Sequence, residues 1–439
     1  MIVHPLVVVF RIGRMNRYSF LALEAGMEAT EGLADIDIVH SPQQEWRRFF
    51  RQLDSLLQAN RIVLVAYSLM TAHLGRVRPE LHRLANHPER QRIVLVGGGP
   101  HAAGTPKSAL ALGLDAVCTG EGEHTFPQLI LHLREHGRLD SFTSPGFYVA
   151  VNGNVRFTGR AAPVSLDDTP PLPLRAGRYG PIEISRGCPH RCKYCQTPVF
   201  KGTRMRHRST DAVVHTVRHL VRAAKVDVRF ITPNGLAYGS PDGHTLELDQ
   251  LARLLTAIRR ELPPHGRVFF GSFPSEVRPE LVTKEAVRLI REVCSNTTIV
   301  LGAQSGNPLM LDAMRRGHTV DQVRQACAAI LEAGLEPVVD FMLGLPRETM
   351  DQMRETMRFM EILAKDGARI HLHSFMPLPG TPWGGLSPTP IPGEIRCHVE
   401  RLITNGSLFG QWKTQERLAS VEVAADGRTC FRKERGTSE

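Results

Sequence analysis

Three cysteines stand in one short run, Cys188, Cys192 and Cys195, with the spacing Cys-x3-Cys-x2-Cys. Three thiolates on one loop can hold three irons of a cubane [4Fe–4S] cluster, which ordinarily takes four cysteines. The fourth iron then stays open for a small molecule. Tyr194 directly precedes the third cysteine, where its ring is expected to pack over the cluster or its ligand. The run therefore predicts an iron–sulfur cluster with one exchangeable position.

Zinc is the competing interpretation of this run. A structural zinc site takes four Cys or His ligands, and His190, inside the run, could supply the fourth. The remaining cysteines are expected to be small buried hydrophobes rather than a second half-site, because they stand singly at Cys118, Cys294, Cys327, Cys397 and Cys430. We therefore favour the cluster.

The spacing, with an aromatic residue before the last cysteine, resembles the radical S-adenosylmethionine (SAM) superfamily. There the open iron binds the amino and carboxylate groups of SAM, and the reduced cluster cleaves SAM to methionine and a 5′-deoxyadenosyl radical. The resemblance implies that Cys188, Cys192 and Cys195 hold the [4Fe–4S] cluster and that SAM binds beside it. It also implies an electron donor such as flavodoxin or ferredoxin.

The elements around the cysteines fit this resemblance. A strand–loop–helix unit recurs along residues 182–385, with strands expected at 182–185, 228–232, 268–271, 298–302, 338–343 and 370–375. Six such units resemble the partial (β/α)6 barrel of radical SAM enzymes. Active sites of parallel barrels lie at the C-terminal strand ends, and the cysteine loop follows the first strand. We expect this barrel to be the catalytic domain.

Polar residues after the later strands are the expected contacts of SAM. Asn234 could accept a hydrogen bond from the SAM amino group through its amide oxygen. Gln304 belongs to a Gly-Ala-Gln-Ser-Gly element that is widespread in the superfamily, and Arg278 is either a carboxylate partner or part of a surface salt bridge. The resemblance implies a SAM-binding set made of Tyr194, Asn234, Ser272, Glu276, Gln304 and Asp340.

Residues 1–140 form a separate pattern, in which apolar runs of a few residues, such as the strand expected at 62–66, alternate with helices. Such runs predict a parallel sheet covered on both faces, a doubly wound Rossmann-like α/β domain. Its loops resemble those of the cobalamin-binding domain that precedes many radical SAM barrels. The resemblance implies cobalamin contacts at Ser68, Thr71, Gly97, Gly98, Gly99, Gly120, Glu121 and Gly122.

The loop after the first strand departs from that family. The usual Asp-x-His-x-x-Gly supplies a histidine to the lower face of cobalt, whereas residues 11–17 read Arg-Ile-Gly-Arg-Met-Asn-Arg. Either cobalamin binds here without a protein histidine, or the domain no longer binds it. We favour binding.

The rest of the chain connects or follows these domains. Residues 141–181 are expected to be a linker with a hairpin, because Asn152-Gly153 separates two short apolar runs. Residues 386–439 carry helical patterns at about 392–402 and 411–419, then a charged tail from about Asp426. We expect the order cobalamin-binding-type domain, linker, radical SAM barrel and helical C-terminal segment.

Composition excludes several classes of protein. Of the 439 residues, 42% are hydrophobic and 22% charged, and no apolar run approaches the length of a membrane span. The eight cysteines form no disulfide framework, and a cluster needs reducing conditions, so we expect a cytoplasmic protein. The net charge of +10 is dispersed, and no aromatic-interleaved stretch suggests nucleic-acid binding.

The sequence thus predicts a radical SAM enzyme, and C-methylation of an unactivated carbon in a small-molecule or peptide substrate is the leading reaction. The alternative is a radical rearrangement or cyclisation without cobalamin. Methylthiolation is less favoured, because that family carries three further cysteines in its N-terminal domain and usually a C-terminal β-barrel. A zinc-bearing nucleic-acid binder is least favoured.

Overall fold

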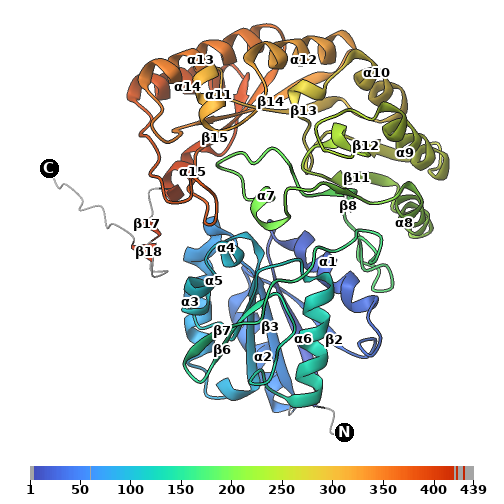
Figure 1. Ribbon diagram of the computed structural model, residues 1–439, viewed down its shortest axis with the longest axis vertical. Helices are drawn as coiled ribbons and strands as arrows, with labels where there is room; N and C mark the ends of the chain where they lie inside the picture. The colour runs from blue at the N-terminus through green and yellow to red at the C-terminus, as the bar shows by residue number, and fades with distance from the viewer. Residues whose placement is uncertain (1–3, 60, 420–421, 424–428, 431–439) are drawn as a thin grey trace, which may run out of the picture. The chain divides into compact units, whose positions relative to one another are not determined.

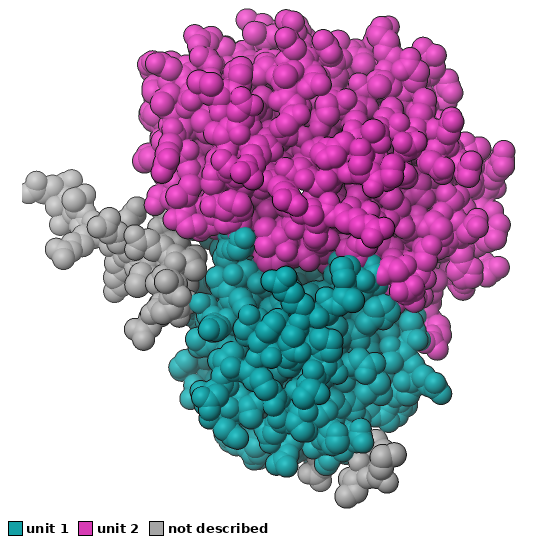
Figure 2. Space-filling view, viewed as in Figure 1, with its two compact units in different colours: residues 1–164, 378–380, 417–439 teal, residues 165–377, 381–416 magenta. Residues whose placement is uncertain are grey.

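The computed structural model describes residues 4–59, 61–419, 422–423 and 429–430, which belong to two compact units (Figure 2). The first unit comprises residues 1–164, 378–380 and 417–439, and the second comprises residues 165–377 and 381–416. The boundary at 164/165 falls inside the segment predicted as a linker. Among the described helices, none combines the length and the apolar composition needed to cross a bilayer.

The first unit is built on a seven-stranded sheet with the order β2-β1-β3-β4-β5-β6-β7 (Figure 1). The strands are β1 (Leu6–Ile12), β2 (Asp37–Pro42), β3 (Ile62–Ser68), β4 (Ile93–Gly98), β5 (Ala116–Cys118), β6 (Phe147–Val151) and β7 (Asn154–Phe157). The first five pair in parallel, whereas β6 and β7 pair antiparallel at the edge. The predicted hairpin is therefore part of this sheet.

Helices cover both faces of the sheet, as the doubly wound prediction requires. One face packs against α1 (Arg17–Glu28) and α6 (Gly122–His136), and the other against α2 (Trp46–Gln58), α3 (Leu74–Ala85) and α5 (Pro106–Leu110). Strand β1 shows why: Val8 belongs to the core of Phe20 in α1, and its neighbour Val9 to the core of Phe49 in α2. Successive side chains of a strand point to opposite faces, so an uninterrupted apolar run buries both.

The second unit contains the predicted series of parallel strands. They are β8 (Ile182–Glu183), β11 (Asp227–Ile231), β12 (Arg267–Phe269), β13 (Thr298–Gln304), β14 (Glu336–Leu343) and β15 (Arg369–Ser374), followed by β16 (Leu408–Phe409), which was not predicted. Their orders are β12-β11-β8 and β13-β14-β15-β16. The two sheets are joined where Val300 N donates to Gly271 O at 2.8 Å. Together they make the expected partial barrel.

The barrel helices lie along the outer side of these strands (Figure 1). They are α8 (Thr210–Arg222), α9 (Leu248–Glu261), α10 (Lys284–Val293), α12 (Val320–Glu332) and α13 (Met350–Lys365). In β14, Phe341 is fully buried and its ring contacts Phe359 of α13. Because strand side chains alternate, Asp340 and Met342 point to the opposite, inner side. The inner side is where polar side chains gather.

The C-terminal segment contains α14 (Gly393–Thr404) and α15 (Trp412–Ala419), which match the two predicted helices. The short strands β17 (Glu422–Val423) and β18 (Thr429–Cys430) pair antiparallel. Apart from residues 429–430, the predicted charged tail lies outside the described residues.

Candidate active site

The three cysteines lie on a loop closed by a short antiparallel pair, β9 (Ser185–Arg186) and β10 (Arg206–His207). Gly187 has a φ of +91°, and a Cβ there would collide with the Arg204 carbonyl. Only glycine takes this close, left-handed turn without strain. Within the loop, Cys188 N donates to Gly202 O at 3.0 Å. The loop is therefore fixed at both ends before any ligand binds.

The three thiols fit a cationic cluster. The pKa of Cys188 is raised to about 11, mainly by burial and in smaller part by the neighbouring Cys195 and Cys192. Burial likewise raises the pKa of Cys195. Buried thiols that oppose one another's ionisation become thiolates only when a cation binds them.

The three thiols are not gathered as closely as a single zinc ion would hold them. Among the described residues, the groups of three ligand atoms within 4.8 Å of one another do not include the three cysteines. A tetrahedral zinc ion holds its sulfurs closer than that, because each Zn–S bond is only about 2.3 Å. His190, the fourth zinc ligand considered, has a buried Nε2 without a hydrogen-bond partner, so only the separation of the sulfurs argues against zinc.

Two buried guanidinium groups contact the central cysteine. Arg316 Nη1 lies 3.8 Å and Arg278 Nη1 4.0 Å from Cys192 Sγ. Arg278 also pairs with Glu280 and is 2% exposed. The predicted salt bridge is therefore present, but it is buried and does not lie at the surface. Arg316 was not predicted, since nothing in the sequence separates it from the exposed Arg315 beside it.

A cradle of polar groups surrounds Gly302 on β13. A Cβ at this glycine would collide with Arg316 Nη2 and would lie 3.0 Å from Gln304 Nε2 and 3.3 Å from Glu276 Oε2. Gln304 has a φ of +73° at an irregularity of the strand. Such a conformation costs a non-glycine residue about 1–3 kcal/mol and is concentrated at functional sites. The structure thus brings Gln304 and Glu276, two predicted SAM contacts, together with Arg316.

Asp340 extends this group. Its side chain is hydrogen-bonded to Glu276; burial raises the pKa of Glu276, Asp340 raises it further, and Arg316 and Arg278 oppose the rise. Neighbouring carboxyl groups that cannot both ionise share a proton. Glu276 is therefore the member disposed to carry that proton and donate it in a hydrogen bond.

The other predicted SAM contacts are Asn234, Ser272 and Tyr194. Asn234 Oδ1 accepts from Arg278 N at 3.1 Å, whereas Asn234 Nδ2 and Ser272 Oγ are buried without a hydrogen-bond partner. The Asn234 oxygen thus already accepts one hydrogen bond, and the amide N–H is the group without a partner. Tyr194 is close enough for Arg316 to affect its pKa, which burial raises. Buried donors of this kind ordinarily have partners, so their state fits a site that receives a ligand.

Two histidines of β15 adjoin Asp340 and were not predicted. His371 Nδ1 lies 2.8 Å from Asp340 Oδ1, and the ligand atoms of Asp340, His371 and His373 all lie within 4.8 Å of one another. Ser374 N donates to Gln415 Oε1, so Gln415 Nε2 donates to His373 Nδ1 at 3.0 Å. A neutral His373 then carries its proton on Nε2.

This tautomer bears on what the cluster of histidines can bind. Metal-bound imidazoles ordinarily donate their second N–H to an acceptor, whereas His373 Nδ1 faces a donor. Burial also lowers the pKa of His373. The arrangement favours hydrogen bonding to a polar ligand over a metal ion.

In the first unit, the predicted cobalamin contacts gather at the carboxyl ends of adjacent parallel strands. Ser68 is in register with Gly98, and Thr71 Oγ1 lies 3.1 Å from His101 Nδ1. At Gly99 a Cβ would lie 2.8 Å from Ser68 Oγ, which explains that glycine by packing. Two further glycines are explained by packing in the same way: a Cβ at Gly97 would collide with the Leu114 side chain, and a Cβ at Gly122 with the Leu23 side chain.

The other predicted cobalamin contacts are two glycines that are not crowded by their neighbours and one buried glutamate. A Cβ at Gly98 or Gly120 would meet only ordinary contacts, at 3.9 and 3.5 Å. The chain's own packing therefore does not require glycine at these two positions, and each leaves room for a ligand. Glu121 Oε2 accepts from Val164 N at 2.8 Å, so its structural role is to hold the end of the unit.

The loop after β1 is fixed by Asn16. Its Oδ1 accepts from Gly13 N at 2.7 Å, and its Nδ2 donates to Ser68 O at 3.3 Å. Arg14 and Met15 are the exposed side chains between them. The loop is thus ordered without a histidine, as the sequence indicated.

Comparisons with known proteins follow the same division. Residues 182–360 match the radical SAM superfamily and residues 22–130 match the B12 binding domain. An uncharacterized protein of Methanopyrus kandleri is 28% identical, covering 77% of this chain and 70% of its own. A tRNA-2-methylthio-N(6)-dimethylallyladenosine synthase of Alkalilimnicola ehrlichii is 27% identical, covering 87% and 81%.

Two solved structures share the fold. The radical SAM methyltransferase TsrM from Kitasatospora setae, with cobalamin and a [4Fe–4S] cluster bound, matches with a TM-score of 0.66 and 18% identity, covering 87% of this chain and 74% of its own. The cobalamin-dependent SAM radical enzyme OxsB, with aqua-cobalamin bound, matches with a TM-score of 0.64 and 15% identity, covering 92% and 56%.

Proposed function

Because the chain belongs to the radical SAM superfamily and carries a B12-binding domain, we propose that it methylates an unactivated carbon of a small-molecule or peptide substrate in a cobalamin-dependent reaction. The family implies a [4Fe–4S] cluster and SAM, and the second domain implies cobalamin. The observation that carries the proposal is the polar cradle at Gly302, beside the cysteine loop, in a chain that also has a cobalamin-type domain.

Bound together, the three cofactors supply an electron, a carbon radical or methyl donor, and a methyl carrier. Cys188, Cys192 and Cys195 hold the iron. The unpaired donors Asn234 Nδ2 and Ser272 Oγ bind the SAM carboxylate, since both are buried and neither can reach water.

The cradle residues orient the rest of SAM. Gln304, held in its left-handed conformation, presents its amide to the ligand. The single proton shared with Asp340 lies in the hydrogen bond between Glu276 and Asp340, which leaves the other oxygen of Glu276 to accept a hydrogen bond from the ligand. The apolar core that includes Met310, Phe375 and Trp383 packs against Tyr194 and so supports its ring next to the cysteine loop.

A second candidate, methylthiolation, is supported by the relatives that bear that name. That family carries three further cysteines in the N-terminal domain, whereas residues 1–140 here contain only Cys118. The chain therefore lacks the ligands for a second cluster in that domain, and we favour C-methylation.

The experiment that tests the proposal is anaerobic reconstitution with iron, sulfide and cobalamin, followed by incubation with SAM labelled in its methyl group and with dithionite. We expect 5′-deoxyadenosine, S-adenosylhomocysteine and labelled methylcobalamin. The matched control is the Cys188→Ala, Cys192→Ala, Cys195→Ala variant. Cleavage of SAM by a protein that retains no cobalamin would move the function to the non-methylating alternative.

A further inference from the structure

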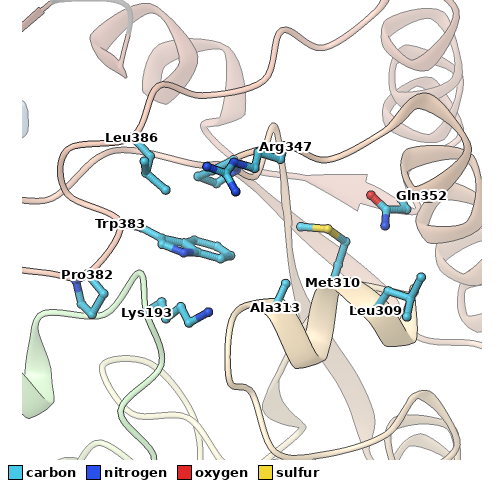
Figure 3. A pocket seen from close by; sticks show the side chains of 10 residues that line it. Lys193, Leu309, Met310, Ala313, Arg347, Gln352, Pro382, Trp383 and Leu386 are labelled. Atoms are coloured by element: carbon cyan, nitrogen blue, oxygen red, sulfur yellow. The ribbon is translucent and has the colours of Figure 1, made fainter.

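A pocket of about 500 Å³ opens beside the cysteine loop of the second unit (Figure 3). Lys193 lines it from the loop itself, Leu309 from α11 (Pro308–Ala313), Arg347 from the turn before α13, and Trp383 from the segment after β15. The predicted SAM contacts do not line it. It is therefore a different site from the cradle at Gly302, although it borders the same loop.

The charge of this pocket is positive only. Lys193 and Arg347 are its charged lining residues, and neither forms an ion pair among the described residues. Figure 3 shows them on either side of the Trp383 ring, and Lys193 Nζ lies 5.9 Å from the centre of that ring. Arg347 has a φ of +64° and is exposed between the buried Pro346 and Glu348. The turn thus projects this guanidinium outward.

The pocket is directly connected to the cluster ligands. Lys193 is the covalent neighbour of Cys192, its N–H donates to Met314 O at 3.0 Å, and its carbonyl accepts from Trp383 N at 3.0 Å. The backbone that bears Lys193 is therefore held from both sides. An electron arriving at Trp383 has one hydrogen bond and a few covalent bonds to cross before it reaches the Cys192 sulfur.

The apolar lining also suits a protein partner. Leu309 is 67% exposed at the rim of the pocket. Together with Trp383 and the two cations, it forms a surface that resembles a small protein interface. Interfaces combine such a hydrophobic centre with charges that steer the partner. The chain's net charge of +10 adds long-range attraction for an acidic protein.

We propose that this pocket is the docking site of an acidic one-electron donor protein of the flavodoxin or ferredoxin kind, whose carboxylates pair with Lys193 and Arg347. The inference rests on the proposed function, because it presupposes the cluster. In the step it describes, the donor is oxidised by one electron and the [4Fe–4S] cluster is reduced by one, from 2+ to 1+. No proton or group is transferred.

The test reverses the two charges in the full, reconstituted enzyme. Lys193→Glu and Arg347→Glu are compared with Arg253→Glu and Arg260→Glu, which make the same charge change at exposed positions of α9. Iron content, the dissociation constant for flavodoxin by calorimetry, and 5′-deoxyadenosine formation are measured for each. Electrons come either from flavodoxin with NADPH and flavodoxin reductase, or from dithionite.

We expect the pocket variants to raise the dissociation constant and the apparent KM for flavodoxin on the order of tenfold, with iron content and the dithionite-driven rate unchanged. The control variants should retain wild-type values for both donors. The wild-type affinity should fall with added salt, and the affinity of the pocket variants should fall less.

Three results would overturn the proposal. The first is a parallel loss of dithionite-driven cleavage, which would assign the two residues to SAM or the cluster. The second is an equal effect of the control variants, which would mean that the overall charge of the protein, and not the pocket, determines flavodoxin binding. The third is a wild-type enzyme that binds neither flavodoxin nor ferredoxin. A wild-type enzyme that cleaves no SAM with dithionite contradicts the proposed function instead.

Discussion

Replacing Arg316 by glutamine should lower the reduction potential of the cluster. Arg316 Nη1 lies 3.8 Å from Cys192 Sγ, and the side chain is buried with Arg278 beside it. Reduction adds a negative charge to the cluster, so a nearby guanidinium stabilises the reduced form. Removing that positive charge destabilises the reduced form and makes the potential more negative.

The size of the shift follows from Coulomb's law. A unit charge about 4 Å from another, at an effective dielectric constant of roughly 20, contributes about 4 kcal/mol. The added electron is shared over the whole cluster, so a mean separation of roughly 6–7 Å and about 2.5 kcal/mol are more realistic. A one-electron couple shifts by about 59 mV for each tenfold change in its equilibrium constant. The expected change is therefore on the order of 100 mV.

An anaerobic redox titration followed by electron paramagnetic resonance measures this shift without SAM or substrate. Arg316→Lys keeps the charge and is the matched control, which should stay close to wild type. Arg278→Gln, which removes the second guanidinium near Cys192, should shift the potential in the same direction. An Arg316→Gln protein with full iron content and the wild-type potential would refute the reasoning.

Three further predictions concern the cofactors. Changing Cys188, Cys192 and Cys195 to alanine together should abolish iron binding, and a triple variant that retains about four irons per chain would contradict the assignment. Gln304→Ala should weaken SAM binding by about 1–3 kcal/mol in calorimetry at unchanged iron content; equal affinity would make Gln304 a structural residue. With cobalamin bound, the cobalt(II) resonance should show no nitrogen splitting from a protein histidine, because residues 11–17 contain none. Such a splitting would contradict the prediction that cobalamin binds without a histidine on the lower face of cobalt.

The strands could be predicted from apolar runs, but their polar ends could not. The run at 62–66 indicated a strand, whereas β3 continues to Ser68 because its backbone stays paired with Gly98. In β13 the pairing continues to Gln304, two residues past the predicted end. Apolar patterning reports burial, and these terminal residues face a site instead. The positions most relevant to function therefore lie where the pattern stops.

The missed residues share a different cause. Arg316 acquires its role by crossing over Gly302, and His371 by its register opposite Asp340. Both depend on contacts that form only in the folded chain. The Asn234 amide illustrates the same limit, since only the position of Arg278 N decides that its oxygen is occupied. A motif supplies the residue type, and the tertiary contacts decide which atom is left for a ligand.

The two charge features near the cysteine loop act on the same step. Arg278 and Arg316 stabilise the added electron from inside, and Lys193 and Arg347 attract its donor from outside. A higher potential lets a weaker physiological donor reduce the cluster, but it lowers the driving force for cleaving SAM. The cluster would then be reduced easily, but its cleavage of SAM would be unfavourable until SAM is bound and oriented. This combination would restrain radical formation in the absence of substrate. On this argument, loss of Arg316 should increase the fraction of SAM cleaved without product once dithionite has reduced the cluster. An unchanged fraction in Arg316→Gln would mean that orientation of SAM by Gln304 and Glu276, rather than cluster potential, limits the uncoupled reaction.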